Sequence, residues 1–239
     1  MKGTGSPVAV GFDLGETLFT YADTPLSWVD LYPAALATVA RACDRTIKGR
    51  EIAEASAILA RYNSRIHPRR DEVTASQIFG DILRTWNVEA ASQLEVAIEA
   101  FFRFFQQRIR AYPESAAVLH ALSVRGVTIG ALTDVPYGMP RAFVQRDLAA
   151  AGLEPLINKV LTSVEVGFRK PEPAGFEALA AELDVTPDQL WFVGNEEKDI
   201  VGARAIGAFA VLIDRDHRRP AWGQDRTISD LGELLVAAN

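Results

Sequence analysis

Short runs of mostly apolar residues recur near the N-terminus of the chain and again after residue 111, and each run ends at polar residues. Runs of this length, closed by glycine-containing or polar turns, are typical of strands that are buried on both faces of a parallel sheet. We therefore predict five strands. They are Val8–Phe12, Val127–Leu132, Lys159–Ser163, Leu190–Val193 and Phe209–Ile213.

Helical spacing of apolar residues fills the gaps between the later strands. Gly126 follows the segment 116–124 at the position favoured after a helix C-terminus, and Pro173 suits a first helical turn. The segment Thr186–Gln189 has the form of a capping box. Repeated strand, helix, strand units predict an α/β fold: a Rossmann-like, parallel five-stranded sheet with helices on both faces.

Residues 21–110 carry helical patterns with almost no strand-like alternation, which predicts an inserted all-α unit between the first two strands. The α/β core then consists of residues 1–20 and 111–239. Two stripes have one-face helical spacing. Their members are Ile78, Phe79, Ile82, Leu83 and Trp86, and Leu94, Ile98, Phe101, Phe102, Phe105 and Ile109. We interpret the aromatic stretch 101–105 as core, with a homodimer surface or a lipid-binding face as the alternatives.

Composition limits the classes of function. The chain has 239 residues, 49% of them hydrophobic, and a net charge of −6, which argues against nucleic acid as a partner. The single cysteine, Cys43, fits a reducing compartment and a small core position. The stretch Met1–Pro7 is short and polar, and no segment is apolar enough to span a membrane. We expect a cytoplasmic protein without a signal peptide or membrane contact.

Polar residues occupy the predicted carboxyl ends of four strands: Asp13, Thr133, Lys170, and the pair Asn195 and Asp199. In parallel α/β sheets these ends meet at one edge, where ligands bind. An Asp13 carboxylate there could attack an anionic centre, while Thr133 and Lys170 hold the anionic group. Asp199 with Asn195 could hold a divalent cation.

At these residues the chain resembles the haloacid dehalogenase (HAD) superfamily, most of whose members are Mg²⁺-dependent phosphatases working through an aspartyl-phosphate. The four family motifs are matched by Asp13–Leu18, Thr133, Gly167–Pro173 and Val193–Ile200. The third and fourth segments, in this order, are the specific signals. The resemblance covers the α/β part, and it implies that residues 21–110 form a helical cap that closes over the site.

The resemblance implies a role for each site residue. Asp13 would be the nucleophile, with Thr133, Asp134 and Lys170 binding a small phosphorylated substrate. Mg²⁺ would be held by Asp13, by the backbone carbonyl of Gly15, and by two residues of the fourth motif, Asn195 and Asp199. The function expected from the resemblance is hydrolysis of a phosphoric monoester.

Two positions depart from the family pattern. Gly15 stands where phosphatases of the family carry the Asp that acts as general acid and base, and Asn195 stands where an Asp metal ligand is usual. Glu16 could supply the proton and Glu196 could add a metal ligand. Losing a general acid typically costs ~10²- to 10⁴-fold in rate, so substrates with good leaving groups would still react.

Two other hypotheses therefore stay open. A dehalogenase would not need the acid, because halide leaves without protonation. A non-catalytic relative could bind a phosphorylated ligand or a protein. A basic cluster either recognises an anionic substrate or is a solvated face. It consists of Arg61, Arg65, His67, Arg69 and Arg70.

Overall fold

A computed structural model describes residues 7–22, 24–25, 27–106, 109–218 and 220–236. Residues 1–6 of the N-terminal stretch, for which no signal peptide is expected, lie outside the described residues. Within the described ranges, no helix combines the length and the apolar character that crossing a bilayer requires.

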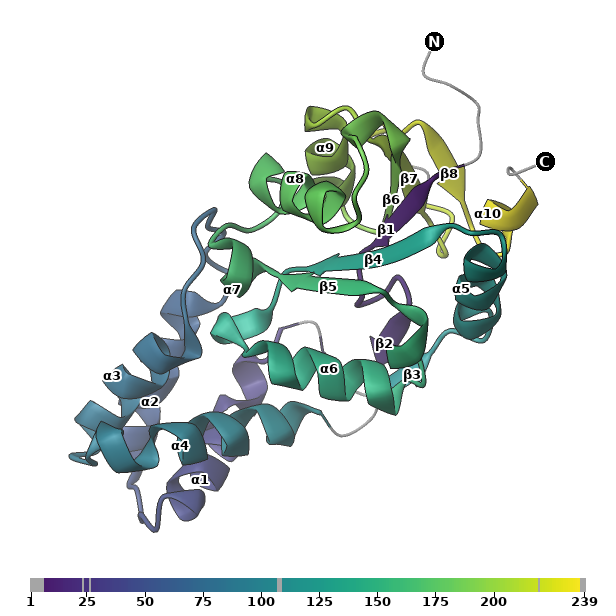
Figure 1. Cartoon of the computed structure of the whole chain (residues 1–239). Helices are drawn as coiled ribbons and strands as arrows, with labels where there is room; N and C mark the ends of the chain where they lie inside the picture. Colours follow the sequence, from purple (N-terminus) through teal and green to yellow (C-terminus); the bar gives the residue numbers. More distant parts are fainter. Residues whose placement is uncertain (1–6, 23, 26, 107–108, 219, 237–239) are drawn as a thin grey trace.

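A parallel sheet forms the centre of the molecule, in the order β5-β4-β1-β6-β7-β8 (Figure 1). Its strands are β1 (Ala9–Phe12), β4 (Thr128–Thr133), β5 (Lys159–Thr162), β6 (Leu190–Gly194), β7 (Phe209–Ile213) and β8 (Arg226–Ile228). The predicted α/β class is confirmed, but the predicted number of five strands is wrong by one. The additional strand β8 is a short edge strand with a polar sequence, so it lacks the apolar run that marks the others.

Helices cover both faces of this sheet (Figure 1). One face carries α8 (Pro173–Glu182) and α9 (Glu197–Ala205), whose apolar residues pack with Phe192 and Leu212 in one core cluster. The other face carries α5 (Ser115–Val124), α6 (Arg141–Ala150) and the short α10 (Glu233–Val236). The one-turn helix α7 (Ser163–Val166) follows β5 directly, because Thr162 and Glu165 form a capping box.

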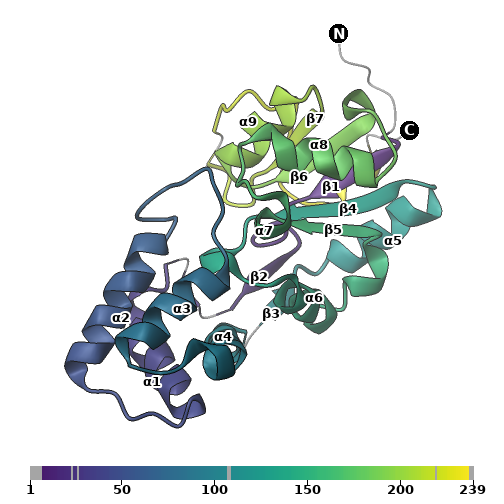
Figure 2. The same cartoon turned by 60° about the vertical axis from the view of Figure 1, so that its left-hand side comes forward.

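The described part of residues 21–110 contains four α-helices, which lie to one side of the large sheet (Figures 1 and 2). They are α1 (Tyr32–Ala42), α2 (Gly49–Tyr62), α3 (Ala75–Thr85) and α4 (Ala90–Phe105). The aromatic residues Phe101, Phe102 and Phe105 are buried, as the core interpretation predicts. Ile109 does not extend that helical stripe, because α4 ends at Phe105 and Ile109 begins a strand.

An antiparallel strand pair marks the two points where the chain enters and leaves the helical segment. Strand β2 (Phe19–Tyr21) pairs with β3 (Ile109–Ala111). These positions lie at the two predicted boundaries of the helical unit, where turns and no strands are expected from the sequence, because three residues are too few to show an alternation. We keep the division into a core and a cap as a prediction, with β2 and β3 as its connections.

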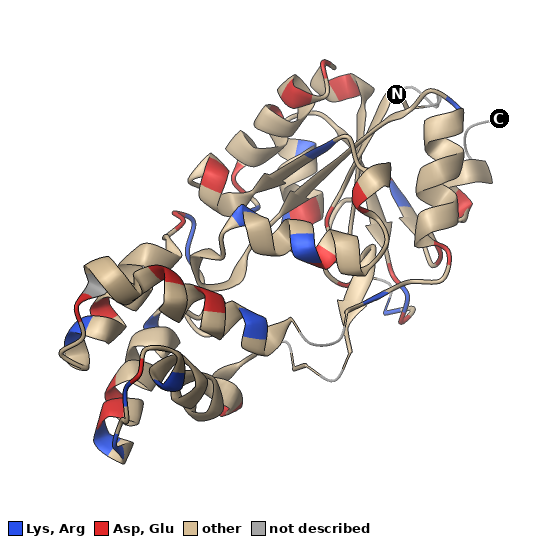
Figure 3. Cartoon of the chain, turned by 60° about the horizontal axis from the view of Figure 1, so that its bottom comes forward, with Lys and Arg blue, Asp and Glu red and all other residues tan. Residues whose placement is uncertain are grey.

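A second contact joins the helical segment to the sheet. The loop before α3 makes a bridge from Asp71 to Phe168, and Glu72 forms a buried ion pair with Arg169. Basic and acidic residues are distributed over both parts of the ribbon (Figure 3). This second contact lies beside the predicted site, because Arg169 immediately precedes Lys170.

Candidate active site

The carboxyl edge of the sheet brings the predicted residues together. Strand β1 lies between β4 and β6, so the residues that end these three strands are neighbours. Asp13 follows β1 and donates its N–H to the carbonyl of Val193, and Thr133 is the last residue of β4. Both side chains are buried but line a common cavity. The topology thereby places a carboxylate and a hydroxyl at the position where ligands bind in parallel sheets.

Lys170 lies between two carboxylates. Its Nζ is 2.6 Å from Oδ1 of Asp13 and 2.6 Å from Oδ1 of Asp199, and it donates to the carbonyl of Leu132 at 3.3 Å. Burial opposes the charged form, but the carboxylates of Asp13 and Asp199 raise the pKa of Lys170 well above its usual range. The cation is therefore retained, and the three residues form one buried charged group.

Asp13 has an unusual environment for a carboxyl group. Burial raises its pKa to about 7, and Asp199 adds to the rise, while Lys170 and Lys198 oppose it. Perturbed carboxyl groups in a cavity are typical of catalytic positions. Asp13 is consequently a poorly solvated carboxylate that faces a cavity, as a nucleophile should be.

Asp199 packs closely against Gly194, the last residue of β6. A Cβ atom on Gly194 would lie 2.4 Å from the Cβ of Asp199, so only glycine allows this approach. Oδ2 of Asp199 accepts the N–H of Glu196 at 3.0 Å in a capping box at the start of α9. Oδ2 of Asp199 is thus hydrogen-bonded, whereas its buried Oδ1 lies beside the Lys170 ammonium but has no hydrogen-bond partner among the described residues.

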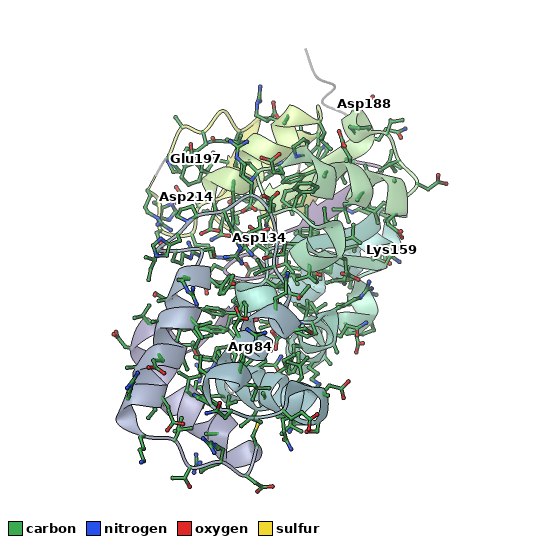
Figure 4. The ribbon with its side chains drawn as sticks, turned by 90° about the vertical axis from the view of Figure 1, so that its left-hand side faces the viewer. Arg84, Asp134, Lys159, Asp188, Glu197 and Asp214 are labelled. Carbon is green, nitrogen blue, oxygen red and sulfur yellow. The ribbon has the colours of Figure 1, made fainter. Side chains whose placement is uncertain are left out.

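Asp134 lies on the other side of Lys170 and is surrounded by positively charged residues. Its Oδ1 accepts the N–H of Lys170 at 3.0 Å, and its Oδ2 lies 3.1 Å from Nζ of Lys198 and 3.8 Å from Arg169. Against the effect of burial, Lys198, Lys170 and Arg169 lower its pKa. Figure 4 shows Asp134 between the labelled Arg84 of the helical segment and Asp188 of the sheet part. Asp134 lines the cavity and also fixes the backbone that carries Lys170.

The loop after β1 leaves space at Gly15. A Cβ atom built there would meet no heavy atom within 4 Å. The neighbouring Glu16 accepts hydrogen bonds from Thr20 at 2.6 Å and from Tyr112 at 2.9 Å. Both oxygens of Glu16 are therefore engaged by hydroxyl groups of the segments that connect to β2 and β3.

Two further polar residues from the fourth motif reach the cavity. Oδ1 of Asn195 accepts the hydroxyl of Thr17 at 3.2 Å. Glu196 lies 2.6 Å from Arg65 and 2.8 Å from Lys198, and these cations lower its pKa to about 2 against the effect of burial. Glu196 is thus committed to two ion pairs.

This site offers few oxygen donors to a divalent cation. No cluster of three or more His, Cys, Asp or Glu side chains suited to a metal occurs in the described part of the chain. The oxygen donors available are the Asp13 carboxylate, the Asn195 amide and the Gly15 carbonyl. Hard oxygens of this kind suit Mg²⁺, which keeps several waters and binds substrate phosphate. Asp199, the fourth predicted ligand, adds to this set a buried Oδ1 that has no hydrogen-bond partner among the described residues.

Sequence reasoning did not single out Lys198 and left the role of Arg65 open. Lys198 is recognisable afterwards as the residue before Asp199 in the first turn of α9. Most of the basic cluster is a solvated face, as one of the two readings predicts: Arg61, Arg65, His67 and Arg70 are exposed, and Arg69 is half-buried and pairs with Glu72. Arg65 is the member that lines the cavity.

A buried carboxyl group, Asp147, also lines the cavity from α6. It accepts hydrogen bonds from the hydroxyl of Tyr21 and from Nε2 of Gln106. Burial raises the pKa of Asp147 to about 6. The sequence signal is visible afterwards: Asp147 shares the inward face of α6 with Phe143 and Leu148.

We expect Asp147→Asn to change how stability depends on pH. The folded pKa of about 6 exceeds the unfolded value of ~3.9, so the folded protein binds more protons between these two values. Wild-type stability from this group is complete at low pH and is lost as pH rises through about 6. Relative to wild type, the variant should gain ~2 kcal/mol in unfolding free energy between pH 4 and pH 7.

Urea denaturation at both pH values measures this gain. The exposed Asp188→Asn controls for the general loss of one negative charge. A difference between Asp147→Asn and wild type that stays constant from pH 4 to pH 7 would contradict the expectation.

The geometry agrees with the comparisons to known proteins. Residues 8–207 match the family model described as haloacid dehalogenase-like hydrolase. A phosphoserine phosphatase from Thermus thermophilus is 37% identical over 155 residues, which are 62% of this chain and 60% of that protein. An (S)-2-haloacid dehalogenase from Pseudomonas is 30% identical over 134 residues, which are 54% of this chain and 57% of that protein. Each of these two matches covers less than two thirds of the length of the relative.

The fold has a counterpart among solved structures. The crystal structure of a HAD phosphatase from Thermococcus onnurineus has a TM-score of 0.61 against this chain, with 24% identity and 95% of both chains covered. At this identity the likeness shows a shared fold.

Proposed function

Because the chain belongs to the haloacid dehalogenase-like hydrolase family, we propose that it is a Mg²⁺-dependent phosphatase acting on a small phosphorylated metabolite. The observation that carries this proposal is the buried group at the sheet edge, with Asp13 and Asp199 each 2.6 Å from Nζ of Lys170. A carboxylate facing a cavity beside a retained cation suits attack on a dianionic phosphate.

In the first step, a carboxylate oxygen of Asp13 forms a bond to phosphorus, and the bond from phosphorus to the ester oxygen breaks. Lys170 and the hydroxyl of Thr133 hold the phosphoryl oxygens, on which negative charge builds up. The ester oxygen leaves as an anion and takes up a proton. In the second step, water attacks the phosphorus of the aspartyl-phosphate and gives up a proton, and the bond from phosphorus to Asp13 breaks, so that the Asp13 carboxylate and inorganic phosphate are released.

Asp13, Asn195, Asp199 and the Gly15 carbonyl would hold Mg²⁺, which when bound offsets the charge of the phosphate. The roles of the other charged residues follow from their contacts. Asp199 keeps Lys170 in place, and Asp134 fixes its backbone. Helices α1–α4 act as the cap, because Arg65 reaches Glu196 across the cavity at 2.6 Å.

The test measures phosphate release from p-nitrophenyl phosphate with Mg²⁺ and with EDTA, and halide release from 2-haloacids. We expect phosphate release that requires Mg²⁺. Halide release independent of metal would instead identify a dehalogenase, which Gly15 favours because halide needs no proton. Absence of both reactions would identify a non-catalytic relative.

A further inference from the structure

The cavity above Asp13 has aromatic walls. Its volume is about 930 Å³, at the upper end of the ~300 to 1,000 Å³ typical of small-molecule sites. Six of its lining residues are Tyr21, Trp28, Tyr62, Tyr112, Tyr137 and Trp222. They come from the helical segment, from the connecting strands and from the sheet part. Aromatic surface of this extent suits a ligand with an apolar, flat body.

The planes of several rings are fixed by stacking. The ring centroid of Trp28 lies 3.8 Å from that of Phe105 and 5.4 Å from that of Tyr137. The guanidinium of Arg215 lies 3.6 Å from the ring centroid of Tyr112. Rings held in this way contribute contact area at little cost in conformational entropy.

Beside Asp13, four carboxyl groups of the same cavity are held as acceptors, and two more, Glu197 and Asp216, are exposed. Glu16 accepts two hydroxyl groups, Glu196 forms ion pairs with Arg65 and Lys198, and Asp134 faces three cations. Asp147 accepts from Tyr21 and Gln106. Gly15, two residues after Asp13, offers open space and no proton donor. A leaving group in this cavity therefore departs without a proton from these carboxyl groups.

Resting on the proposed phosphatase function, we infer that the substrate is the phosphate ester of an aromatic hydroxyl group. A phenol has a pKa of ~10, whereas an aliphatic alcohol is close to water, at ~16. A phenolate can leave phosphorus as an anion and take its proton from solvent afterwards. Asp13 forms the bond to phosphorus, the bond to the phenolic oxygen breaks, and the ring remains among the aromatic residues until release.

Four phosphate compounds, each assayed with Mg²⁺, test the leaving-group effect and the binding of the ring separately. Phenyl phosphate has a ring and a good leaving group, and benzyl phosphate has a ring and a poor one. Acetyl phosphate has a good leaving group without a ring, and cyclohexyl phosphate lacks both. We expect kcat for phenyl phosphate to exceed kcat for benzyl phosphate by ~10²-fold or more. Acetyl phosphate should be hydrolysed with a KM at least ~10-fold above that for phenyl phosphate.

Single substitutions test which residue causes the leaving-group effect and which residue binds the ring. Gly15→Asp places a carboxyl group in open space, so it should raise the ratio of kcat for benzyl phosphate to kcat for phenyl phosphate ~10-fold or more. Trp28→Leu should raise KM for phenyl phosphate more than KM for acetyl phosphate. Arg84→Ala on α3 is the control, and thermal unfolding verifies that each variant is folded.

The outcomes are distinguishable. Equal kcat for phenyl and benzyl phosphate would overturn the inference while the phosphatase function stands. Loss of benzyl phosphate turnover in Asp147→Asn would overturn it also, because Asp147 would then be the acid. Equal KM values for benzyl and cyclohexyl phosphate would show that the cavity does not favour an aromatic ring. Absence of phosphate release from all four, acetyl phosphate included, would contradict the proposed phosphatase itself.

Discussion

Asp13→Asn should reduce the rate of phosphate release by ~10⁴-fold or more at saturating substrate. The amide is nearly the same size as the carboxylate but is far less nucleophilic, so the attack on phosphorus is lost while the cavity is retained. The measurement is kcat for p-nitrophenyl phosphate or phenyl phosphate with Mg²⁺. In wild type, acid quenching during turnover should also leave phosphate on the peptide that contains Asp13.

Asp188→Asn provides the matched control, since Asp188 is exposed and lies in the turn before β6, away from the labelled Asp134 (Figure 4). Its kcat should equal that of wild type. Residual activity of Asp13→Asn within ~10-fold of wild type would show that Asp13 is not the nucleophile. Phosphate recovered on another peptide would lead to the same conclusion.

Lys170→Met should lower both activity and stability. The ammonium is the shared partner of Asp13 and Asp199, and Asp199 has no exposed surface. Removing the cation leaves two neighbouring carboxylates without their compensating charge, which typically costs ~3–5 kcal/mol of unfolding free energy. Activity should fall by ~10²- to 10³-fold or more, because the charge that builds up on the phosphoryl group loses a donor.

Denaturant unfolding at neutral pH measures the stability change, with Lys159→Met as the control. Lys159 is an exposed lysine that pairs with Glu182 at 2.9 Å, and surface pairs contribute only ~1 kcal/mol or less. Adding Asp199→Asn to Lys170→Met should recover part of the lost stability, because one of the two carboxylates is then neutral. Equal losses for Lys170→Met and Lys159→Met would contradict the buried charged group.

The sequence predicted best those elements whose apolar runs are long enough to be recognised. The predicted range 209–213 coincides with β7, and Gly126 follows α5 in the left-handed conformation that the prediction assumed. Strands β2, β3 and β8 have three residues each, and their pairing depends on partners distant in the chain. Ile109 fitted the helical spacing of α4, but the chain turns into β3 before reaching it.

The site shows the same limit. Lys170 was predicted at a strand end but lies on the segment after α7, because β5 already ends at Thr162. The topology of a parallel sheet predicts that Asp13 and Thr133 meet at one edge. It does not predict the partners of these residues, because they come from elements whose packing is tertiary. Lys198 forms ion pairs with both Asp134 and Glu196, and the buried Asp147 accepts a hydrogen bond from the hydroxyl of Tyr21. Both positions resemble ordinary helical polar residues until α6 and α9 are placed against the sheet.

The adjacent strands β2 and β3 have a consequence for motion during a catalytic cycle. Since the polypeptide passes to and from helices α1–α4 through one narrow ribbon, we expect any movement of these helices against the sheet to turn about this ribbon. Glu16 binds Thr20 on this ribbon and Tyr112 beside it, so such a rotation would displace the loop that follows the nucleophile. Outward rotation must also separate Arg65 from Glu196 and Glu72 from Arg169. Release of product is therefore expected to compete with chemistry as the slow step.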